Sequence, residues 1–292
     1  MKLATFPHCV LLLFTTSLVQ DCQKYRYQTI NTAEAIPLTL NPSPIIFQTF
    51  NCFKSVSLIV GGEEAKKGEF PHHALLGYPK EDFPDQFEFK CGGSLISERF
   101  VLTAAHCMRS GRPKIVRLGE HDLRNEEGNR ADIGIESTMR HPHHKFSLSY
   151  HDIALIKLNQ RIPFSPYIRP ACLWDDMHFN VSSAIATGFG YTEFLGAHPS
   201  DVLRKVQLDF LEKEVCQGQF LGMKKFSIGI QDGQLCIGSK RKGRDTCEGD
   251  SGGPLQIITE PKGCIYYVLG VTSVGTGCGT GVSPAVYTSV AS

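Results

Sequence analysis

Short apolar runs separated by turn-forming residues dominate the chain after position 59. Segments rich in Val, Ile, Leu and Phe, such as KIVRLGEHDL, HDIALIKLN and YYVLGVTSVG, alternate with clusters of Gly, Pro, Asn and Asp. Strands of this length and spacing are typical of an all-β sandwich or barrel. The segment VLRKVQLDFLEKEVC fits either an amphipathic helix or a strand that runs into a short helix. We find no internal repeat of fixed period.

The first 58 residues follow a different pattern. Lys2 precedes an apolar run, Cys9–Val19, which small or polar residues follow. This order is typical of a secretory signal peptide over residues 1–19, because the run is much shorter than the roughly 20 residues that a membrane-spanning helix needs. Residues 20–58 are turn-rich and have too few apolar positions for a domain, so we interpret them as a pro-segment. No later apolar stretch is long enough to span a membrane.

Charge and cysteine content narrow the classes of function. The formal net charge of +1 over 292 residues, without a dense basic run, argues against a nucleic-acid partner. The chain has 11 cysteines, of which Cys9 would leave with the signal peptide. The remaining ten are an even number in an exported chain, which indicates disulfides. The alternative is a metal site, but the paired C-x-x-C spacings that are typical of such sites are absent. We expect no metal site and no cofactor.

Three segments carry residues that could act together in hydrolysis. His106 lies in TAAHC, Asp152 precedes the apolar run IALIKL, and Ser251 lies in the glycine-rich GDSGGP. A serine hydroxyl needs a nearby base, which a histidine supplies, and a buried aspartate orients that histidine. The glycines would let the backbone N–H groups of Gly249 and Ser251 form an oxyanion hole. Each residue alone is more often structural, but this chain order is that of chymotrypsin-type enzymes.

Six segments, in this order, resemble the motifs of the trypsin family of serine proteases. They are IVGGEEAKKGEFPHHALL, CGGSLISERFVLTAAHC, HDIALIKL, RPACLW, GRDTCEGDSGGPL and SPAVYT. The resemblance runs from Ile59 to about Val290 and implies a peptidase domain over residues 59–292. It implies two six-stranded antiparallel β-barrels with the catalytic residues in the cleft between them. Within the family, YTEFLGA, LRKVQLDF, GRDTCEGDSGGPLQ and Cys264 resemble the snake-type branch of insect clip-domain proteases.

The resemblance also implies substrate-binding residues. Asp245 matches the carboxylate at the base of a pocket that binds Arg or Lys side chains. Ser273 and Gly275 match residues that hold the substrate backbone and leave the mouth of the pocket open. Ala285 stands where a pocket-wall glycine is usual, so its methyl group should crowd a long basic side chain.

Activation by cleavage between Leu58 and Ile59 is implied as well. The new α-amino group of Ile59 would pair with Asp250 and so order the backbone around Gly249. Because Leu58 is neither Arg nor Lys, we expect an upstream activating protease that accepts Leu58, and we expect no self-activation.

The family's disulfide pattern implies four bridges. They are Cys91–Cys107, Cys216–Cys236, Cys247–Cys278 and Cys52–Cys172. The last of these would keep the pro-segment attached after cleavage. Cys22 and Cys264 are left over, and a bond between them stays open.

Two departures from the family concern the ends of the chain. Clip-domain proteases carry a six-cysteine module before the peptidase, whereas only Cys22 and Cys52 lie upstream here, so we expect that module to be missing or reduced. The sequence ends at Ser292, where the family continues into a C-terminal helix, so we expect that helix to be truncated. This ending puts the stability of the fold in doubt.

A third departure concerns calcium. The segment EHDLRNEEGNR keeps Glu120 and Glu127, but Arg130 stands where a ligand carboxylate is expected. A guanidinium group should not be tolerated among the oxygen ligands of a hard cation, and Asp132 is the alternative source of the missing carboxylate. We therefore expect no calcium site.

Together these features predict a secreted zymogen of a serine endopeptidase that cleaves after Arg or Lys. The expected partners are a downstream zymogen of an extracellular proteolytic cascade, an activating protease and a serpin inhibitor. Asn180 begins a sequon and is the expected glycosylation site. The alternative is a catalytically weak or inactive homologue, or a truncated isoform, that acts by binding. The intact set of catalytic residues favours the enzyme, and the early end of the chain is the only support for the alternative.

Overall fold

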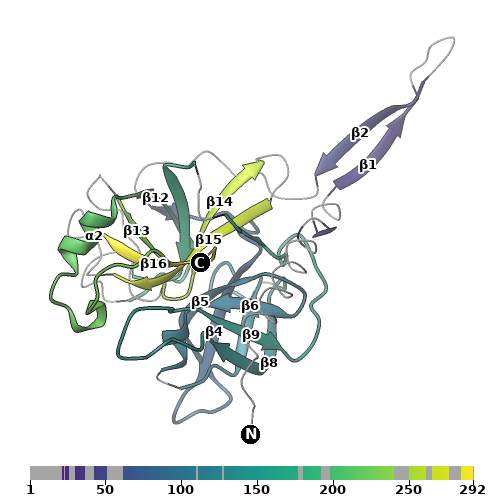
Figure 1. Cartoon of the computed structure of the whole chain (residues 1–292). Coiled ribbons are helices and arrows are strands. Elements are labelled where there is room, and N and C mark those ends of the chain that lie inside the picture. The colour runs from purple at the N-terminus through teal and green to yellow at the C-terminus, as the bar shows by residue number, and fades with distance from the viewer. Residues whose placement is uncertain are drawn as a thin grey trace, which may run out of the picture.

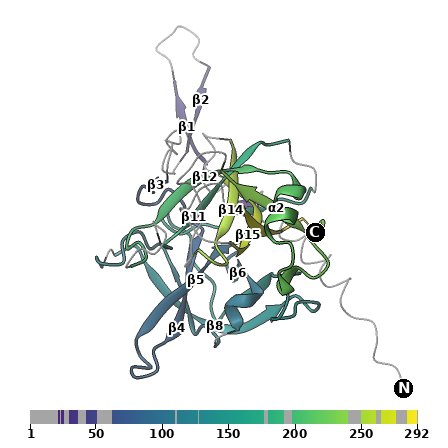
Figure 2. The same cartoon turned by 90° about the vertical axis from the view of Figure 1, so that its left-hand side faces the viewer.

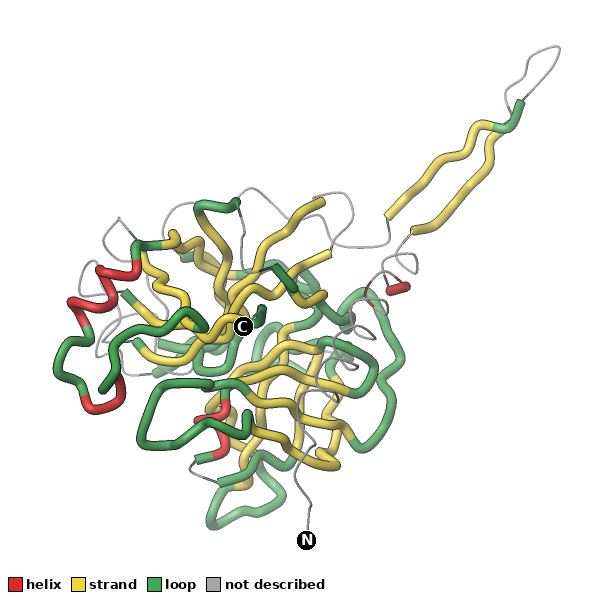
Figure 3. Tube along the Cα trace, viewed as in Figure 1, coloured by secondary structure: helices red, strands yellow, loops and turns green. Residues whose placement is uncertain are grey.

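Strands account for most of the regular structure in the computed structural model (Figure 3). Val, Ile, Leu and Phe recur in these strands, and side chains on alternate positions enter a core, as in β9 (Ala154–Leu158), where Ala154, Ile156 and Leu158 are buried. The structure describes residues 22, 24–25, 30–36, 43–50, 62–109, 111–126, 128–176, 180–191, 198–239, 250–260, 265–275 and 284–291.

The first half of the peptidase region forms a closed barrel of six antiparallel strands. The order around the barrel is β4-β5-β6-β9-β8-β7. Besides β9, the strands are β4 (His73–Pro79), β5 (Phe87–Leu95), β6 (Phe100–Thr103), β7 (Ile115–Leu118) and β8 (Ala131–Arg140). Closure leaves no free sheet edge in this barrel.

The second half forms another closed ring, because β15 pairs with both β14 and β16. Its strands are β11 (Ser183–Gly188), β12 (Arg204–Phe210), β13 (Gln234–Gly238), β14 (Pro254–Glu260), β15 (Ile265–Val274) and β16 (Ala285–Ser289). Short β3 (Glu63–Glu64) adds to β12, and β10 (Cys172–Leu173) runs parallel to β15. The predicted fold of two six-stranded antiparallel barrels is confirmed.

The two barrels share one apolar core at their junction. A single cluster of buried residues joins Leu76 and Val101 of the first barrel to Tyr266 and Val268 of the second. In Figure 1 the first barrel lies below the second, and Figure 2 shows the same two bodies from the side. Residues at the ends of strands from both barrels therefore meet along this junction.

Short helices occur in the connections between strands. The helices are η1 (Ala105–Met108), α2 (Lys213–Gln219) and η2 (Lys224–Phe226). The segment VLRKVQLDFLEKEVC fitted either an amphipathic helix or a strand that runs into a short helix. The structure shows the second of these, strand β12 followed by helix α2. A disulfide between Cys216 and Cys236 fixes α2 against β13.

A hairpin of β1 (Ile30–Ala35) and β2 (Ile45–Phe50) projects away from the barrels (Figures 1 and 2). The sequence analysis found little periodicity in the predicted pro-segment and did not predict these strands. Ile36, Ile45 and Ile46 are exposed, which agrees with a segment that has no core of its own. Across the described residues, we find no helix with the length and apolar character needed to cross a membrane.

One predicted disulfide needs correction. Cys172 is bonded to Cys22, and not to Cys52 as predicted, so the tether begins nearer the amino terminus. Sequence cannot decide connectivity among several cysteines, because every pairing is compatible with the same spacing. The bridges Cys91–Cys107 and Cys216–Cys236 are present as predicted. The remaining cysteines of these predictions lie outside the described residues, namely Cys52, Cys247, Cys264 and Cys278.

Candidate active site

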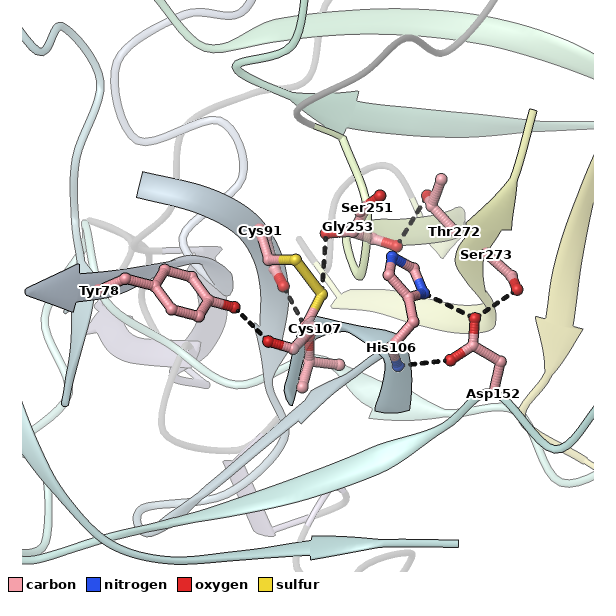
Figure 4. The surroundings of a disulfide bond; sticks show 11 residues. Tyr78, Cys91, His106, Cys107, Asp152, Ser251, Gly253, Thr272 and Ser273 are labelled. Carbon is pink, nitrogen blue, oxygen red and sulfur yellow. Dashed lines mark hydrogen bonds and ion pairs between the residues drawn. A yellow bond between two sulfur atoms is a disulfide. The ribbon is translucent and has the colours of Figure 1, made fainter. Parts of the chain in front are cut away.

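His106 is presented by the short helix η1 at the end of β6. The Cys91–Cys107 disulfide ties this helix to β5, and the Tyr78 hydroxyl donates a hydrogen bond of 2.7 Å to the Cys107 carbonyl (Figure 4). These two restraints fix the residue that follows His106 in the chain. The imidazole is therefore held at the rim of the first barrel with a defined direction.

Asp152 holds the His106 ring from one side. The Asp152 Oδ2 accepts a hydrogen bond of 2.7 Å from the His106 Nδ1, and the Asp152 Oδ1 accepts one of 2.8 Å from the His106 backbone N–H. Asp152 is 2% exposed and directly precedes Ile153 and β9. The two-point contact fixes both the position and the rotation of the imidazole.

The second barrel also contacts Asp152. The Ser273 hydroxyl of β15 donates a hydrogen bond of 2.5 Å to Oδ2, and the Thr288 hydroxyl of β16 donates one of 3.1 Å to the Asp152 carbonyl. The sequence analysis assigned Ser273 to the substrate backbone and missed this contact and that of Thr288. No local signal could have revealed them, because 121 and 136 residues separate the partners.

Electrostatics keep Asp152 ionised. Burial acts to raise the pKa of this carboxyl, but hydrogen bonds and charge from His106, with the Ser273 hydroxyl, outweigh it and lower the pKa below its ordinary value. A carboxylate can only accept hydrogen bonds, so the proton between the two groups lies on the His106 Nδ1. The other ring nitrogen, Nε2, then has a free lone pair that can take a proton.

Ser251 lies on the opposite side of the His106 ring from Asp152 (Figure 4). Its carbonyl accepts a hydrogen bond of 2.8 Å from the Gly92 N–H of β5, so the turn that carries Ser251 is anchored to the first barrel. The next residue, Gly252, has φ of +78°, and a Cβ atom there would lie 2.3 Å from the Thr103 Oγ1. Only glycine fits at this point, which explains the Ser-Gly order of the motif.

Asp250 points away from this turn and toward the end of β11. Its Oδ1 accepts a hydrogen bond of 2.9 Å from the Gly190 N–H. A Cβ atom at Gly188 would lie 1.8 Å from the same oxygen, so the carboxylate occupies space that a side chain would need. The predicted activation residues, Leu58 and Ile59, lie outside the described residues.

The structure thus brings together four of the predicted site residues: His106, Asp152, Ser251 and Ser273. Ala285 is buried at the start of β16, and Gly275 is exposed just after β15. Asn180 is exposed. Asp245 and Gly249 lie outside the described residues, so the pocket and the oxyanion hole remain predictions.

Ion pairs occupy the segment that carries the candidate calcium ligands. The Arg117 guanidinium contacts both Asp132 oxygens at 2.7 Å and lies 3.3 Å from Glu120. Arg130 lies 3.7 Å from the same Glu120 oxygen. Glu120 and Asp132, two of the candidate ligands, are therefore already bound to guanidinium groups. Glu127 lies outside the described residues.

One group near the site has donor atoms of the kind that bind metals. The donor atoms of Cys91, His106 and Cys107 lie within 4.8 Å of one another. Both sulfur atoms, however, belong to the Cys91–Cys107 disulfide and cannot act as thiolate ligands. This group therefore serves to position His106.

Comparison with known proteins agrees with this geometry. The family model described as Trypsin matches residues 59–292. The chain is 41% identical over 271 residues to Serine protease snk of Drosophila melanogaster, covering 91% of this chain and 61% of the relative. It is 38% identical to Venom serine protease Bi-VSP of Bombus ignitus, in a match that covers 80% of this chain and 66% of the relative. It is 33% identical to CLIP domain-containing serine protease B8 of Anopheles gambiae, in a match that covers 93% of this chain and 73% of the relative. The chain thus spans about three fifths of the length of the Drosophila relative.

Proposed function

The chain belongs to the trypsin family of serine proteases, and from this premise we propose that it is a secreted serine endopeptidase made as a zymogen. One observation carries the proposal. The His106 imidazole is hydrogen-bonded to the buried carboxylate of Asp152 and lies between that carboxylate and Ser251. This arrangement supplies a nucleophile, a base and a group that stabilises the protonated base.

The proposed reaction follows from the protonation of the three groups. The Ser251 hydroxyl gives its proton to the His106 Nε2 as its oxygen attacks the carbonyl carbon of the scissile peptide bond. Asp152 stabilises the imidazolium that forms, and backbone N–H groups of Gly249 and Ser251 bind the oxyanion. His106 then gives the proton to the leaving amine. Water, activated by the same histidine, releases the acyl group and restores Ser251.

The proposed substrates are proteins with Arg or Lys at the cleaved bond. A carboxylate at Asp245 would bind a guanidinium or ammonium group, and a neutral side chain would leave that charge unpaired. The methyl group of Ala285 would narrow the pocket and weaken binding without changing this preference.

Activation would occur by cleavage between Leu58 and Ile59. The new α-amino group would bind Asp250 and thereby order the turn that carries Gly249 and Ser251. We infer an upstream protease that accepts Leu58, a downstream zymogen as substrate and a serpin as inhibitor, as expected for an extracellular cascade. The similarity to clip-domain proteases supports this role.

Export is supported by two kinds of observation. Residues 1–19 have the order of a signal peptide, and the disulfides Cys91–Cys107 and Cys216–Cys236 suit an oxidising compartment. The exposed Asn180 is open to glycosylation in that compartment.

The test compares the activated wild-type chain with Ser251→Ala. The zymogen is cut with a protease that cleaves after Leu, the new amino terminus is sequenced, and both proteins are assayed on a peptide library. We expect cleavage after Arg and, less well, Lys, and we expect Ser251→Ala to lose about four orders of magnitude or more in kcat.

The matched control is Ser227→Ala, which removes an exposed hydroxyl in a loop after η2 and should retain full activity. Circular dichroism checks that both variants are folded. Near wild-type activity in Ser251→Ala would overturn the catalytic assignment. A preference for apolar residues at the cleaved bond would remove Asp245 from the pocket.

A further inference from the structure

Large apolar side chains are exposed in the connection between α2 and β13. Leu221, Met223 and Ile228 are 77%, 43% and 68% exposed. They line a groove of about 490 Å³, together with the buried side chains of Phe220 and Phe226. Apolar side chains that gather in this way on a surface mark a place where another molecule binds. We call this feature, formed by residues 217, 220–224 and 226–230, the α2 groove.

Hydrogen bonds and ring packing fix the shape of the α2 groove. The Tyr150 hydroxyl donates a hydrogen bond of 3.0 Å to the Gly229 carbonyl and accepts one of 3.0 Å from the Ile228 N–H. The ring centroids of Phe220 and Phe226 are 4.7 Å apart, so these two side chains support the groove from the inside. A site that is already formed loses less conformational entropy when a partner binds.

The charge of the α2 groove indicates the chemistry of its partner. Lys224 and Lys225 are the only charged residues between positions 215 and 230. Both are exposed, and neither forms an ion pair with any residue that the structure describes. The groove is therefore both apolar and cationic. It suits a protein segment in which carboxylates flank a large apolar side chain, because the charges on the two surfaces then match.

The chain itself carries a segment of this kind, at the tip of the β4–β5 hairpin. Phe83 is 59% exposed, and it is the only aromatic residue among the large apolar side chains that are exposed in the described structure. Glu81, Asp82 and Asp85 flank it and are exposed as well. Within the described ranges, none of these three carboxylates forms an ion pair. We call residues 81–85 the acidic tip.

The acidic tip is a formed turn. The Gln86 N–H donates a hydrogen bond of 2.9 Å to the Phe83 carbonyl, and the Lys80 N–H donates one of 2.9 Å to the Gln86 carbonyl. Pro84 restricts the backbone directly after Phe83. The phenyl ring is therefore presented to solvent on a constrained turn, as an anchor residue in a protein interface should be.

The acidic tip and the α2 groove do not cover each other within one chain. The tip belongs to the first barrel and the groove to the second, and both Phe83 and Leu221 are exposed. We propose that the chain associates with itself head to tail. The Phe83 ring of one copy lies in the α2 groove of the next copy, and the flanking carboxylates lie beside Lys224 and Lys225.

This contact joins two different surfaces, which determines the kind of assembly. Each copy that binds through its acidic tip still has an unoccupied α2 groove, so association continues beyond a dimer unless a ring closes. A single small contact of this type gives weak association that depends on concentration. The contact uses none of the proposed catalytic residues, so it is independent of the proposed proteolysis.

The test is sedimentation equilibrium of the intact, uncleaved chain over a range of concentrations. We expect the average mass to rise with concentration, and we expect added sodium chloride to weaken association because salt screens exposed charges. Phe83→Ser and Leu221→Ser should each lower the association constant at least about tenfold, because each removes part of the apolar contact. Circular dichroism checks that the variants are folded.

Charge reversal tests the match between the two surfaces. Lys224→Glu together with Lys225→Glu makes the groove acidic, and Glu81→Lys together with Asp82→Lys makes the tip basic. Each doubly substituted chain alone should remain monomeric, because its tip and its groove then carry charge of the same sign. An equimolar mixture of the two should associate, because the tip of each then meets a groove of opposite charge on the other.

Two exposed apolar residues elsewhere provide matched controls. Met139→Ser removes a side chain of β8, and Ile46→Ser removes one of the β1–β2 hairpin. Both variants should associate as the wild type does. The proposal is overturned if the wild type stays monomeric at every concentration, if Phe83→Ser associates unchanged, or if the mixture of charge-reversed chains stays monomeric. Loss of association in Ile46→Ser alone would also overturn it, because the contact would then lie on the hairpin.

Discussion

His72 and His73 are two adjacent buried imidazoles at the start of β4. The His72 Nε2 is hydrogen-bonded to the Gln256 side-chain oxygen, and the His73 Nδ1 is hydrogen-bonded to the Thr187 hydroxyl at 3.0 Å. Burial lowers the pKa of His72 to about 4. Burial, together with charge repulsion from His72, lowers the pKa of His73 to about 3. Both rings are therefore neutral in the folded protein between about pH 6.5, where imidazoles in water become charged, and about pH 4.

This difference predicts how stability depends on pH. The unfolded chain binds up to two more protons than the folded chain once the pH falls below about 6.5. The contribution of these two groups to the free energy of unfolding is fully present above that pH. It is lost as the pH falls towards 4, at up to about 2.7 kcal/mol per pH unit for both groups together. Urea unfolding from pH 7.5 down to pH 4.5 measures this slope.

In His73→Gln, the part of the slope of unfolding free energy against pH that comes from these two groups should be about halved. His198→Gln should leave the slope unchanged, because that side chain is exposed in the folded state as well. An equal slope in the wild type and His73→Gln would show that His73 titrates normally in the folded protein.

A buried ion pair joins β12 to the segment that precedes β4. The Lys205 ammonium lies 2.7 Å from Glu69 and 3.0 Å from Glu63. Lys205 and Glu69 are each only 2% exposed at their side chains. The pair fixes the start of the peptidase region onto the second barrel, close to where the predicted cleavage site lies in sequence.

Lys205→Met should therefore destabilise the protein strongly. Removing the ammonium leaves the Glu69 carboxylate buried without its cation, which costs about 3–5 kcal/mol in the free energy of unfolding. Adding Glu69→Leu should recover most of this loss, because no buried charge then remains. Chemical denaturation measures both changes.

The control for this prediction is Lys213→Met, which breaks the exposed pair of α2 with Asp232 and should leave the free energy of unfolding nearly unchanged. If Lys205→Met costs as little as this control, the pair is not buried in solution.

At the scale of the whole molecule, the disulfide between Cys22 and Cys172 connects the amino-terminal segment to the second barrel. The β1–β2 hairpin lies between this anchor and the predicted cleavage site in sequence, and it projects from the barrels (Figure 1). Cleavage at Leu58 would thus leave a light chain that is held covalently near its beginning.

The corrected pairing predicts the fate of that light chain. After cleavage at Leu58, the wild-type fragments should stay together on non-reducing gels and separate on reducing gels. Cys22→Ala should release the light chain without reductant, because Cys172 loses its partner. Cys52→Ala should retain it. Release in Cys52→Ala but not in Cys22→Ala would restore the pairing implied by the family.

The sequence by itself determined the strand-rich class, and its resemblance to the trypsin family implied the two-barrel fold and singled out His106, Asp152 and Ser251. Local patterns are sufficient for the first conclusion, because apolar alternation specifies strands, and glycines such as Gly252 mark backbone shapes that other residues cannot adopt. The motifs around each catalytic residue are also local. The β1–β2 hairpin escaped detection because Ile36, Ile45 and Ile46 are exposed, so burial of these residues imposes no clear pattern on the segment.

Only the tertiary structure decided which distant groups meet. The Ser273 and Thr288 hydroxyls reach Asp152 from the other barrel, and Cys22, not Cys52, reaches Cys172. Each contact depends on how distant segments of the chain pack in the folded protein, since that packing sets distances between residues far apart in sequence. Local propensity carries no information about those distances, so no motif could have specified these contacts.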